Sequence, residues 1–203
     1  YGPSSAVHDA ITRTPGSFKQ TIEGVQNVLE RPDVTVTANT VPLNMNFLFL
    51  EETGRMLSDL GVNIWSIVDL IPGGLPQNLY KTVAGRMDDL VSSIESLFDL
   101  RQGFSNIQFF DYPLCLFPVR MRECKDFSFI TAKRREEISS QVGYDSKRID
   151  IKDGIYEDKH RERIPTCKRC IFDDECGGIW KNYLKIHGEE EIKRLAEINN
   201  CLR

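Results

Sequence analysis

The sequence predicts an α/β protein built on a parallel sheet, followed by a small cysteine-rich region. Helix-like and strand-like segments alternate three times between residues 17 and 110, and such alternation is typical of a parallel sheet with crossover helices. The predicted strands are hydrophobic, which fits strands buried on both faces. Near the end of the chain, three cysteines fall within ten residues, at Cys167, Cys170 and Cys176.

The N-terminal segment is predicted to be a loop followed by a helix. Residues 1–16 are rich in Gly, Pro, Ser and Thr, which favour loops. Ser17 is predicted to cap the helix, with Gln20 three residues later completing a capping box. Arg31-Pro32 ends it. Its apolar residues recur at helical spacing, at Phe18, Ile22, Val25 and Leu29.

Two more helix–strand pairs complete this pattern. Residues 34–41 are predicted as a strand because β-branched residues dominate them. A helix over 47–60 ends at Gly61, which suits a helix C-terminus. The remaining expected elements are a strand over 62–70, a helix over 78–100 and a strand over 106–110.

The loops after the predicted strands are the expected place for function, as they are in (β/α) barrels. They span residues 39–46, 69–77 and 111–115. Three strands cannot close a barrel, so either the sheet stays open or further strands precede Tyr1. The chain begins Tyr-Gly-Pro without a methionine, and a cut or processed start is part of this interpretation.

The pattern changes after Pro118. Residues 119–163 are charged and weakly periodic, and the charge runs at 133–137 and 159–163 are interpreted as solvated surface. Residues 127–131 and 148–151 are predicted to form the two strands of a hairpin. The last helix is predicted over 189–202, where acidic residues suit the positive end of its dipole.

Composition limits the possible partners. The chain has 203 residues, of which 40% are hydrophobic and 28% charged, and a net charge of −4, so broad nonspecific nucleic-acid binding is not expected. No apolar run approaches the roughly 20 residues needed to span a bilayer, and no signal peptide is recognised. Six cysteines including a Cys-x-x-Cys favour a reducing cytoplasm and a metal over a disulfide framework.

The three clustered cysteines predict a metal centre. A Cys-x-x-Cys turn brings two thiolates to one metal, and Gly177-Gly178 lets the chain fold closely around an inorganic group. Thiolates favour zinc or an iron–sulfur cluster, and spacing does not decide between them. Cys115 or Cys124 is expected to supply the fourth ligand, whereas Cys201 is expected to pack.

Several segments resemble radical S-adenosylmethionine enzymes. YGPSSAVHDAITRTPGSFKQTIEG resembles the stretch after the third barrel strand, and VTVTANTVPLNMN the fourth strand with its Asn-bearing loop. VNIWSIVDLIPGG is similar to the fifth strand and FFDYPLC to the sixth. The pattern C-x2-C-x5-C-G, with the following Tyr183 and Gly188, is similar to the cluster end of the SPASM and twitch subgroup.

The resemblance implies part of a (β/α)6 partial TIM barrel over residues 1–113 and an auxiliary iron–sulfur region over 114–203. S-adenosylmethionine would be the cofactor of the full-length protein. Cys115 is preferred to Cys124 because Pro113 fixes the chain as it leaves a buried strand, whereas Cys124 lies in a charged segment. The expected ligands of an auxiliary 4Fe–4S cluster are therefore Cys115, Cys167, Cys170 and Cys176.

One departure from the family is the absence of C-x3-C-x2-C, the motif that holds its radical cluster. The resemblance therefore implies a C-terminal portion, whose partner would be the missing N-terminal half of the barrel. Alone, this chain is not expected to cleave S-adenosylmethionine.

Further side chains are candidate contacts of the cofactor or the cluster. Thr37 and Asn39 share one face of a predicted strand and are expected near the cofactor or substrate, unless Asn39 only caps the strand. Asp69 either accepts a ribose hydroxyl or forms an Asx turn. Lys168 and Arg169 either stabilise an anionic cluster or are plain surface charge. The His8-Asp9 pair is interpreted as incidental and exposed in a loop.

The most consistent function is radical-based modification of an unknown small molecule or peptide, in peptide or protein maturation or in cofactor synthesis. Two alternatives remain. One is a non-catalytic, zinc-binding interaction module, and the other is an unrelated α/β enzyme with a zinc knuckle. Membrane partners are not expected, and the net negative charge argues against nucleic-acid partners.

Overall fold

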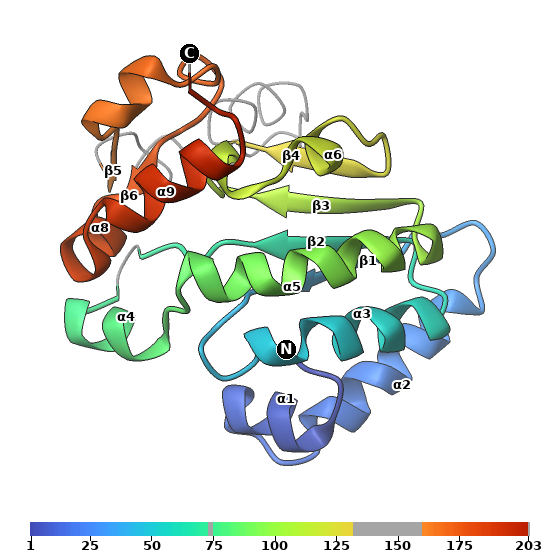
Figure 1. Ribbon diagram of the computed structural model, residues 1–203. Coiled ribbons are helices and arrows are strands. Elements are labelled where there is room, and N and C mark those ends of the chain that lie inside the picture. The colour runs from blue at the N-terminus through green and yellow to red at the C-terminus, as the bar shows by residue number, and fades with distance from the viewer. Residues whose placement is uncertain (73–74, 132–159, 203) are drawn as a thin grey trace, which may run out of the picture.

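The computed structural model describes residues 1–72, 75–131 and 160–202. Four parallel strands form one sheet, in the order β1-β2-β3-β4. Two helices, α3 (Leu50–Asp59) and α5 (Met87–Leu100), lie across one face of it (Figure 1). The strands are β1 (Thr37–Thr40), β2 (Ile64–Val68), β3 (Asn106–Phe110) and β4 (Phe127–Ile130). The predicted α/β class is therefore confirmed, although β1 and β2 are shorter than expected.

The core lies between the sheet and these two helices. Trp65 is fully buried, and its indole N–H donates to the Thr40 hydroxyl across 2.9 Å, which satisfies the buried donor. Gly54 of α3 allows the close approach of Trp65, because a Cβ there would lie 2.6 Å from the indole ring. The other buried residues of the sheet and the two helices include Ile67, Ile107, Phe109, Leu90, Ile94 and Leu97.

The N-terminal segment corrects the predicted loop. Residues 1–16 contain a helix, α1 (Ser5–Thr12), which precedes α2 (Ser17–Leu29). Gly16, not Ser17, is the N-cap of α2, and the Asp9 carboxylate accepts the Phe18 N–H across 2.7 Å. Loop-favouring residues lie on either side of α1, at Gly2-Pro3 and Thr14-Pro15-Gly16, and so the helical stretch between them was not recognised from the sequence. Asp9 thus supplies the cap that the sequence assigned to Ser17.

The helix predicted over 78–100 is two helices. They are α4 (Gln77–Val83) and α5, and Ala84 between them pairs with Leu43 in an isolated antiparallel bridge. The Ala84 N–H still donates to the Tyr80 carbonyl, but the Val83 carbonyl accepts the N–H of Asn44, in the loop after β1, so the helix does not continue beyond this point. The break leaves the N-terminus of α5 near the carboxyl ends of the strands (Figure 1).

The fourth strand, β4, lies where the first strand of the predicted hairpin was expected, over residues 127–131. β4 pairs in parallel with β3, and Phe129 lies opposite Phe109. Residues 148–151, the expected partner strand, lie outside the described residues. Two short elements, η3 (Leu114–Leu116) and α6 (Val119–Arg122), return the chain from β3 to the start of β4.

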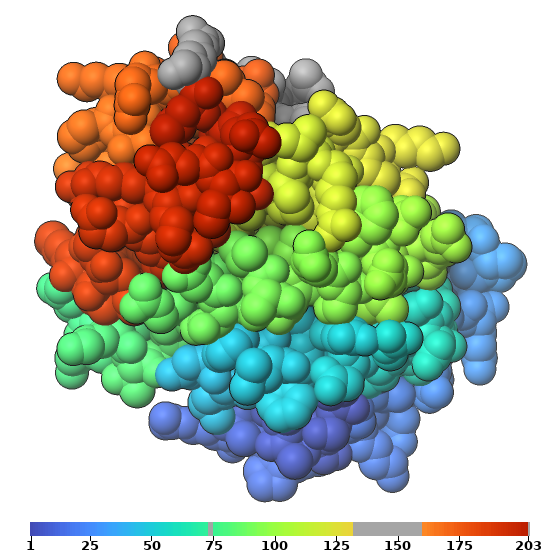
Figure 2. All heavy atoms as spheres, in the orientation of Figure 1, coloured from blue at the N-terminus to red at the C-terminus, as the bar shows by residue number. Residues whose placement is uncertain are grey.

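The C-terminal region lies at the carboxyl ends of β2 and β3 (Figure 1). In the space-filling view its red surface adjoins the green surface of the preceding half of the chain (Figure 2). Its strands β5 (Arg161–Glu162) and β6 (Ile179–Trp180) pair antiparallel. The remaining elements are η5 (Pro165–Arg169), α8 (Lys181–His187) and α9 (Glu190–Ile198). The last helix ends four residues earlier than predicted, because Leu202 leaves it to pair with Cys170.

One apolar cluster runs through both parts of the described chain. It includes Phe109 of the sheet and Tyr183 and Ile192 of the C-terminal region. None of the described helices has the length and apolar character needed to cross a membrane.

A candidate site at the carboxyl ends of the strands

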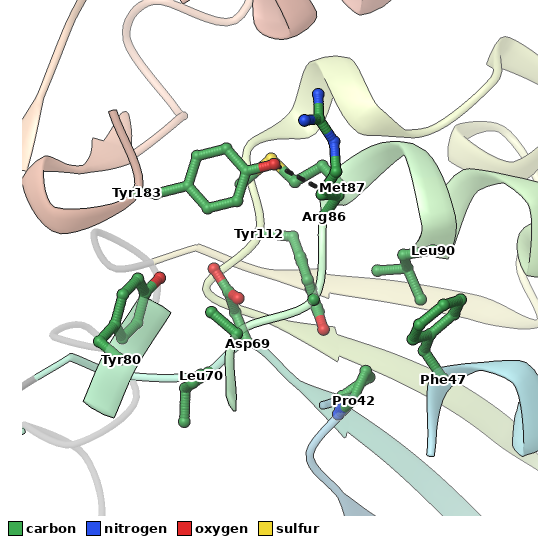
Figure 3. A pocket seen from close by; sticks show the side chains of 12 residues that line it. Pro42, Phe47, Asp69, Leu70, Tyr80, Arg86, Met87, Leu90, Tyr112 and Tyr183 are labelled. Atoms are coloured by element: carbon green, nitrogen blue, oxygen red, sulfur yellow. Dashed lines mark hydrogen bonds between the residues drawn. The ribbon is translucent and has the colours of Figure 1, made fainter. Parts of the chain in front are cut away.

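A recess opens where the strands end and the C-terminal region begins (Figure 3). It encloses about 390 Å³ including the space open to solvent, and its interior holds little more than a water molecule. The recess alone is therefore too small to enclose a cofactor. Its lining residues come from the loops after three strands and from α4, α5 and α8, and they include Pro42, Asp69, Tyr80, Arg86, Met87, Tyr112 and Tyr183.

Asp69 is the acidic side chain of this recess. It follows β2, and its Oδ2 accepts the indole N–H of Trp180 across 2.9 Å. Burial raises the pKa of Asp69 to about 7; Arg161 opposes this rise, and nearby Asp111 adds to it. A carboxyl group with this pKa can give or accept a proton near neutral pH.

Arg161 joins the C-terminal region to the end of β3. Its guanidinium donates to the carbonyl oxygens of Asp111, at 3.0 Å, and Gly178, at 3.1 Å. It also pairs with Asp111 Oδ1 at 3.2 Å and lies 3.7 Å from the centre of the Trp180 ring. The sequence placed residues 159–163 on a solvated face, but Arg161 is only 5% exposed. Nothing in the local charge run distinguishes Arg161 from its exposed neighbours.

A second polar network caps the N-terminus of α5. The Tyr183 hydroxyl donates to Glu191 and accepts the Met87 N–H across 2.9 Å, while the other Glu191 oxygen accepts the Asp88 N–H across 2.7 Å. Both acceptors satisfy amides that the first turn of a helix leaves without partners. Residues of α8 and α9 thus cap a helix about one hundred positions earlier.

Thr37 and Asn39 lie outside the recess, in contrast to Asp69. Both are exposed on the same face of β1, as period-two alternation predicts. Asn39 belongs to a polar row that crosses the sheet in register through Ser66, Gln108 and Ser128. Ser66 and Gln108 are joined by a hydrogen bond of 3.1 Å. Asn39 is therefore grouped with polar side chains of neighbouring strands and not with Asp69.

His8 is not the exposed loop residue that the sequence indicated. It lies in α1 and is only 7% exposed. Its ring packs against the rings of Tyr1 and Phe18. His8 therefore has a packing role at the N-terminal end of α2.

The cysteine segment folds back on itself. The Cys170 N–H donates to the Cys167 carbonyl across 2.9 Å, and the Cys176 N–H donates to the Phe172 carbonyl across 2.8 Å. Gly178 then takes a positive φ of 80°. A Cβ there would lie 2.7 Å from the Glu162 carbonyl oxygen, so this glycine permits the close pairing of β5 and β6.

Five thiols gather in this region. Burial raises the pKa of Cys115 well above its usual value, and the neighbouring thiols of Cys176, Cys201, Cys170 and Cys167 raise it further. Cys115 is therefore close to all three cysteines of the C-x2-C-x5-C segment. The fifth thiol, Cys201, is fully buried, as expected for a packing residue, but it lies beside the others. The Ile171 N–H donates to the Cys201 carbonyl across 2.8 Å.

Cys124 stands apart from this five-thiol group. The thiols with the largest influence on the pKa of Cys115 are the other four, and Cys124 is not one of them. Its own thiol is directed to Asp126 Oδ2, 3.7 Å away. The structure thus separates the two cysteines that the sequence offered as alternative fourth ligands.

The five-thiol group has the donors for a thiolate-bound metal centre but not a finished ligand geometry. Within residues 1–72, 75–131 and 160–202, no group of three or more His, Cys, Asp or Glu side chains is arranged to hold a metal ion. Sulfur donors match zinc and iron–sulfur chemistry. Binding either one requires local adjustment of side chains and release of thiol protons.

Comparison with known proteins gives two partial matches. Over 73 residues, or 36% of the chain, the sequence is 30% identical to "AdoMet-dependent heme synthase" of Oleidesulfovibrio alaskensis, covering 19% of that protein. Over 94 residues, or 46% of the chain, it is 28% identical to the protein of the same name from Nitratidesulfovibrio vulgaris, covering 23% of it. The chain is distantly similar to part of AdoMet-dependent heme synthase.

The matches span only about a fifth of the length of these curated relatives. No family model matches the chain, and no solved structure matches it. The similarity agrees with the parallel sheet, which is consistent with a partial TIM barrel.

Proposed function

We propose that this chain is part of a radical S-adenosylmethionine enzyme and that its cysteine-rich region binds an auxiliary 4Fe–4S cluster. The partial similarity to two proteins named AdoMet-dependent heme synthase carries the proposal. The parallel sheet with crossover helices is in keeping with it. Of the two processes that the sequence leaves open, this similarity favours cofactor synthesis over peptide maturation.

The cluster would be held by Cys115, Cys167, Cys170 and Cys176. Their mutual proximity supports this set, because Cys115 is 52 or more positions away along the chain and yet lies near the other three. When bound, a cluster of this kind transfers electrons or braces the fold. The chain itself contributes soft sulfur donors, of which Cys115 is buried and the other three are partly buried, with the buried Cys201 as an adjacent fifth thiol.

The recess at Asp69 would form one wall of the reaction site. Asp69 would hold or move a proton there, since its carboxyl group titrates near neutral pH. Trp180 fixes the orientation of that carboxyl group, and Arg161 fixes Trp180. S-adenosylmethionine contacts by Thr37 and Asn39 belong to the same proposal, on the sheet face that carries the polar row.

Metal analysis tests the proposal. The protein is prepared without exposure to air and reconstituted with iron and sulfide, and about four of each are expected per chain, with the brown colour of a 4Fe–4S cluster. A Cys167→Ala, Cys170→Ala double variant is the control and should bind none. Stoichiometric zinc without iron in anaerobically purified protein would contradict the proposal and favour the zinc-binding interaction module.

A further inference from the structure

Arg122 reaches into the five-thiol group from the end of α6. Its Nη1 donates to the Phe117 carbonyl across 2.7 Å and lies 3.1 Å from the Cys201 sulfur. Its Nη2 donates to the Asn199 carbonyl across 2.9 Å. The guanidinium thus connects the segment after Cys115 with the segment that contains Cys201.

The same guanidinium also faces the C-x2-C-x5-C segment. Its central carbon lies 4.8 Å from the centre of the Phe172 ring, and Phe172 lies between Cys170 and Cys176. Arg122 is the cation that acts on both Cys170 and Cys201. Three segments that carry thiols therefore meet around one positive charge.

The charge of Arg122 is not neutralised by a carboxylate in the part of the chain that the structure describes. Its contacts there are two carbonyl oxygens, one sulfur and one aromatic ring. Arg120, two residues earlier, instead pairs with Glu95 at 2.7 Å. The positive charge of Arg122 is therefore directed at the thiols.

We propose that Arg122 is the counter-charge of the cysteine-rich region and raises the reduction potential of the cluster bound there. This inference rests on the proposed function, because it requires an iron–sulfur cluster at the five-thiol group. A cluster with thiolate ligands becomes more negative on reduction. A nearby cation and an N–H group directed at a sulfur stabilise that reduced state, most strongly in a partly buried site.

The sequence favours a different cation for this role. Lys168 and Arg169 lie between the cysteines of the segment, yet both are exposed. Water and salt screen an exposed charge, so its influence on a buried centre is small. Arg169 thus provides a matched control: an arginine next to a predicted ligand in sequence, but without the contacts of Arg122.

The experiment measures the midpoint potential of the reconstituted cluster in four proteins: the unaltered chain, Arg122→Gln, Arg122→Lys and Arg169→Gln. A redox titration followed by electron paramagnetic resonance gives the potential independently of any enzyme activity. We expect Arg122→Gln to shift it to a more negative value and Arg122→Lys to shift it less. Arg169→Gln should leave it unchanged.

Equal potentials in all four iron-loaded proteins would overturn the role of Arg122 while leaving the proposed function intact. A shift in Arg169→Gln alone would transfer the role to Arg169. If Arg122→Gln fails to retain iron, Arg122→Met decides the question, because it removes the charge but keeps an unbranched side chain to pack against Phe172. A potential more negative than that of Arg169→Gln supports the inference, and an equal one rejects it. Failure of the unaltered chain to bind iron would reject both proposals.

Discussion

Trp180 donates its indole N–H to Asp69 across 2.9 Å and so joins residues 111 positions apart. Asp69 directly follows the second strand of the sheet, whereas Trp180 lies four residues after the last cysteine of the C-x2-C-x5-C segment. The Arg161 guanidinium packs over the Trp180 ring, 3.7 Å from its centre. The carboxyl group in the recess therefore depends on the cysteine-rich region for its surroundings.

The first prediction concerns the pH dependence of stability. The pKa of Asp69 is raised by burial to about 7 in the folded protein, and its value in the unfolded chain is about 3.9. Between these values the unfolded chain loses the proton while the folded protein keeps it, so the free energy of unfolding falls as pH rises from about 4 to about 7. Asp69→Asn removes this titration and keeps an oxygen acceptor for Trp180.

Urea unfolding of both proteins at several pH values tests this prediction. Relative to Asp69→Asn, the unaltered protein should lose stability from about pH 4 to about pH 7 and show no further change above that. A constant difference between the two proteins across this range would show that the Asp69 carboxyl group has an ordinary pKa.

The second prediction concerns the cap of α5. Tyr183→Phe removes the hydroxyl group that accepts the Met87 N–H and donates to the buried Glu191. Leaving buried polar groups without a partner costs about 1–3 kcal/mol. We expect the free energy of unfolding, measured in urea, to fall by about that amount.

Tyr80→Phe is the matched control for Tyr183→Phe. Tyr80 is only 1% exposed and lines the same recess. Its hydroxyl group, however, forms no hydrogen bond with any of the described residues. Its removal should change the free energy of unfolding by less than about 0.5 kcal/mol. Equal losses in the two variants would mean that Tyr183 stabilises the protein by packing and not by capping α5.

Local patterns in the sequence were sufficient for the first three strands of the sheet and most of its helices, but not for the pairing of β4 with β3. The strand over 106–110 was predicted to the residue, since it is bounded by clear turn signals. The helix over 78–100 was not, because its break depends on pairing between Ala84 and Leu43, which no local pattern contains. The loop prediction for residues 1–16 failed because turn-forming residues flank α1 closely.

The site was predictable only where spacing carries chemistry. The C-x2-C-x5-C pattern identified three of the five neighbouring thiols, and position after a strand identified Asp69. Arg122 and Arg161 could not be distinguished, because both lie in charged segments and owe their roles to long-range contacts. Long-range packing therefore determines which of many similar arginines become buried.

The third prediction concerns the contact between α3 and β2. In Gly54→Ala the new Cβ would lie 2.6 Å from the Trp65 ring and 2.8 Å from Leu100. Such overpacking typically costs about 1–3 kcal/mol. Thermal unfolding should show a lower midpoint for this variant.

Gly24→Ala is the matched control, because the same substitution at this position is expected to raise stability. Gly24 lies within α2, and nothing is found within 4 Å of the position of its added Cβ. Alanine there should stabilise the protein by about 0.4–1 kcal/mol. If Gly54→Ala also stabilised the protein, the close packing of α3 on Trp65 would be wrong.

The fourth prediction concerns the ligands of the proposed cluster. Cys115→Ala should lose iron, because the Cys115 thiol lies among those of the C-x2-C-x5-C segment. It should also lose stability in the iron-loaded protein, since metal binding contributes to the folding free energy. Cys124→Ala is the matched control and should keep the iron, because the Cys124 thiol is directed to Asp126 and stands apart from the group.

Cys201→Ala then separates two possible ligand sets. The set predicted from the sequence leaves Cys201 outside, so this variant should keep about four irons per chain while losing the contact between Arg122 and sulfur. Loss of iron in Cys201→Ala, together with retention in Cys115→Ala, would replace Cys115 by Cys201. Loss of iron in Cys124→Ala alone would instead show that α6 must rearrange when the cluster binds, because its C-terminal end holds Cys124 away from the other five cysteines.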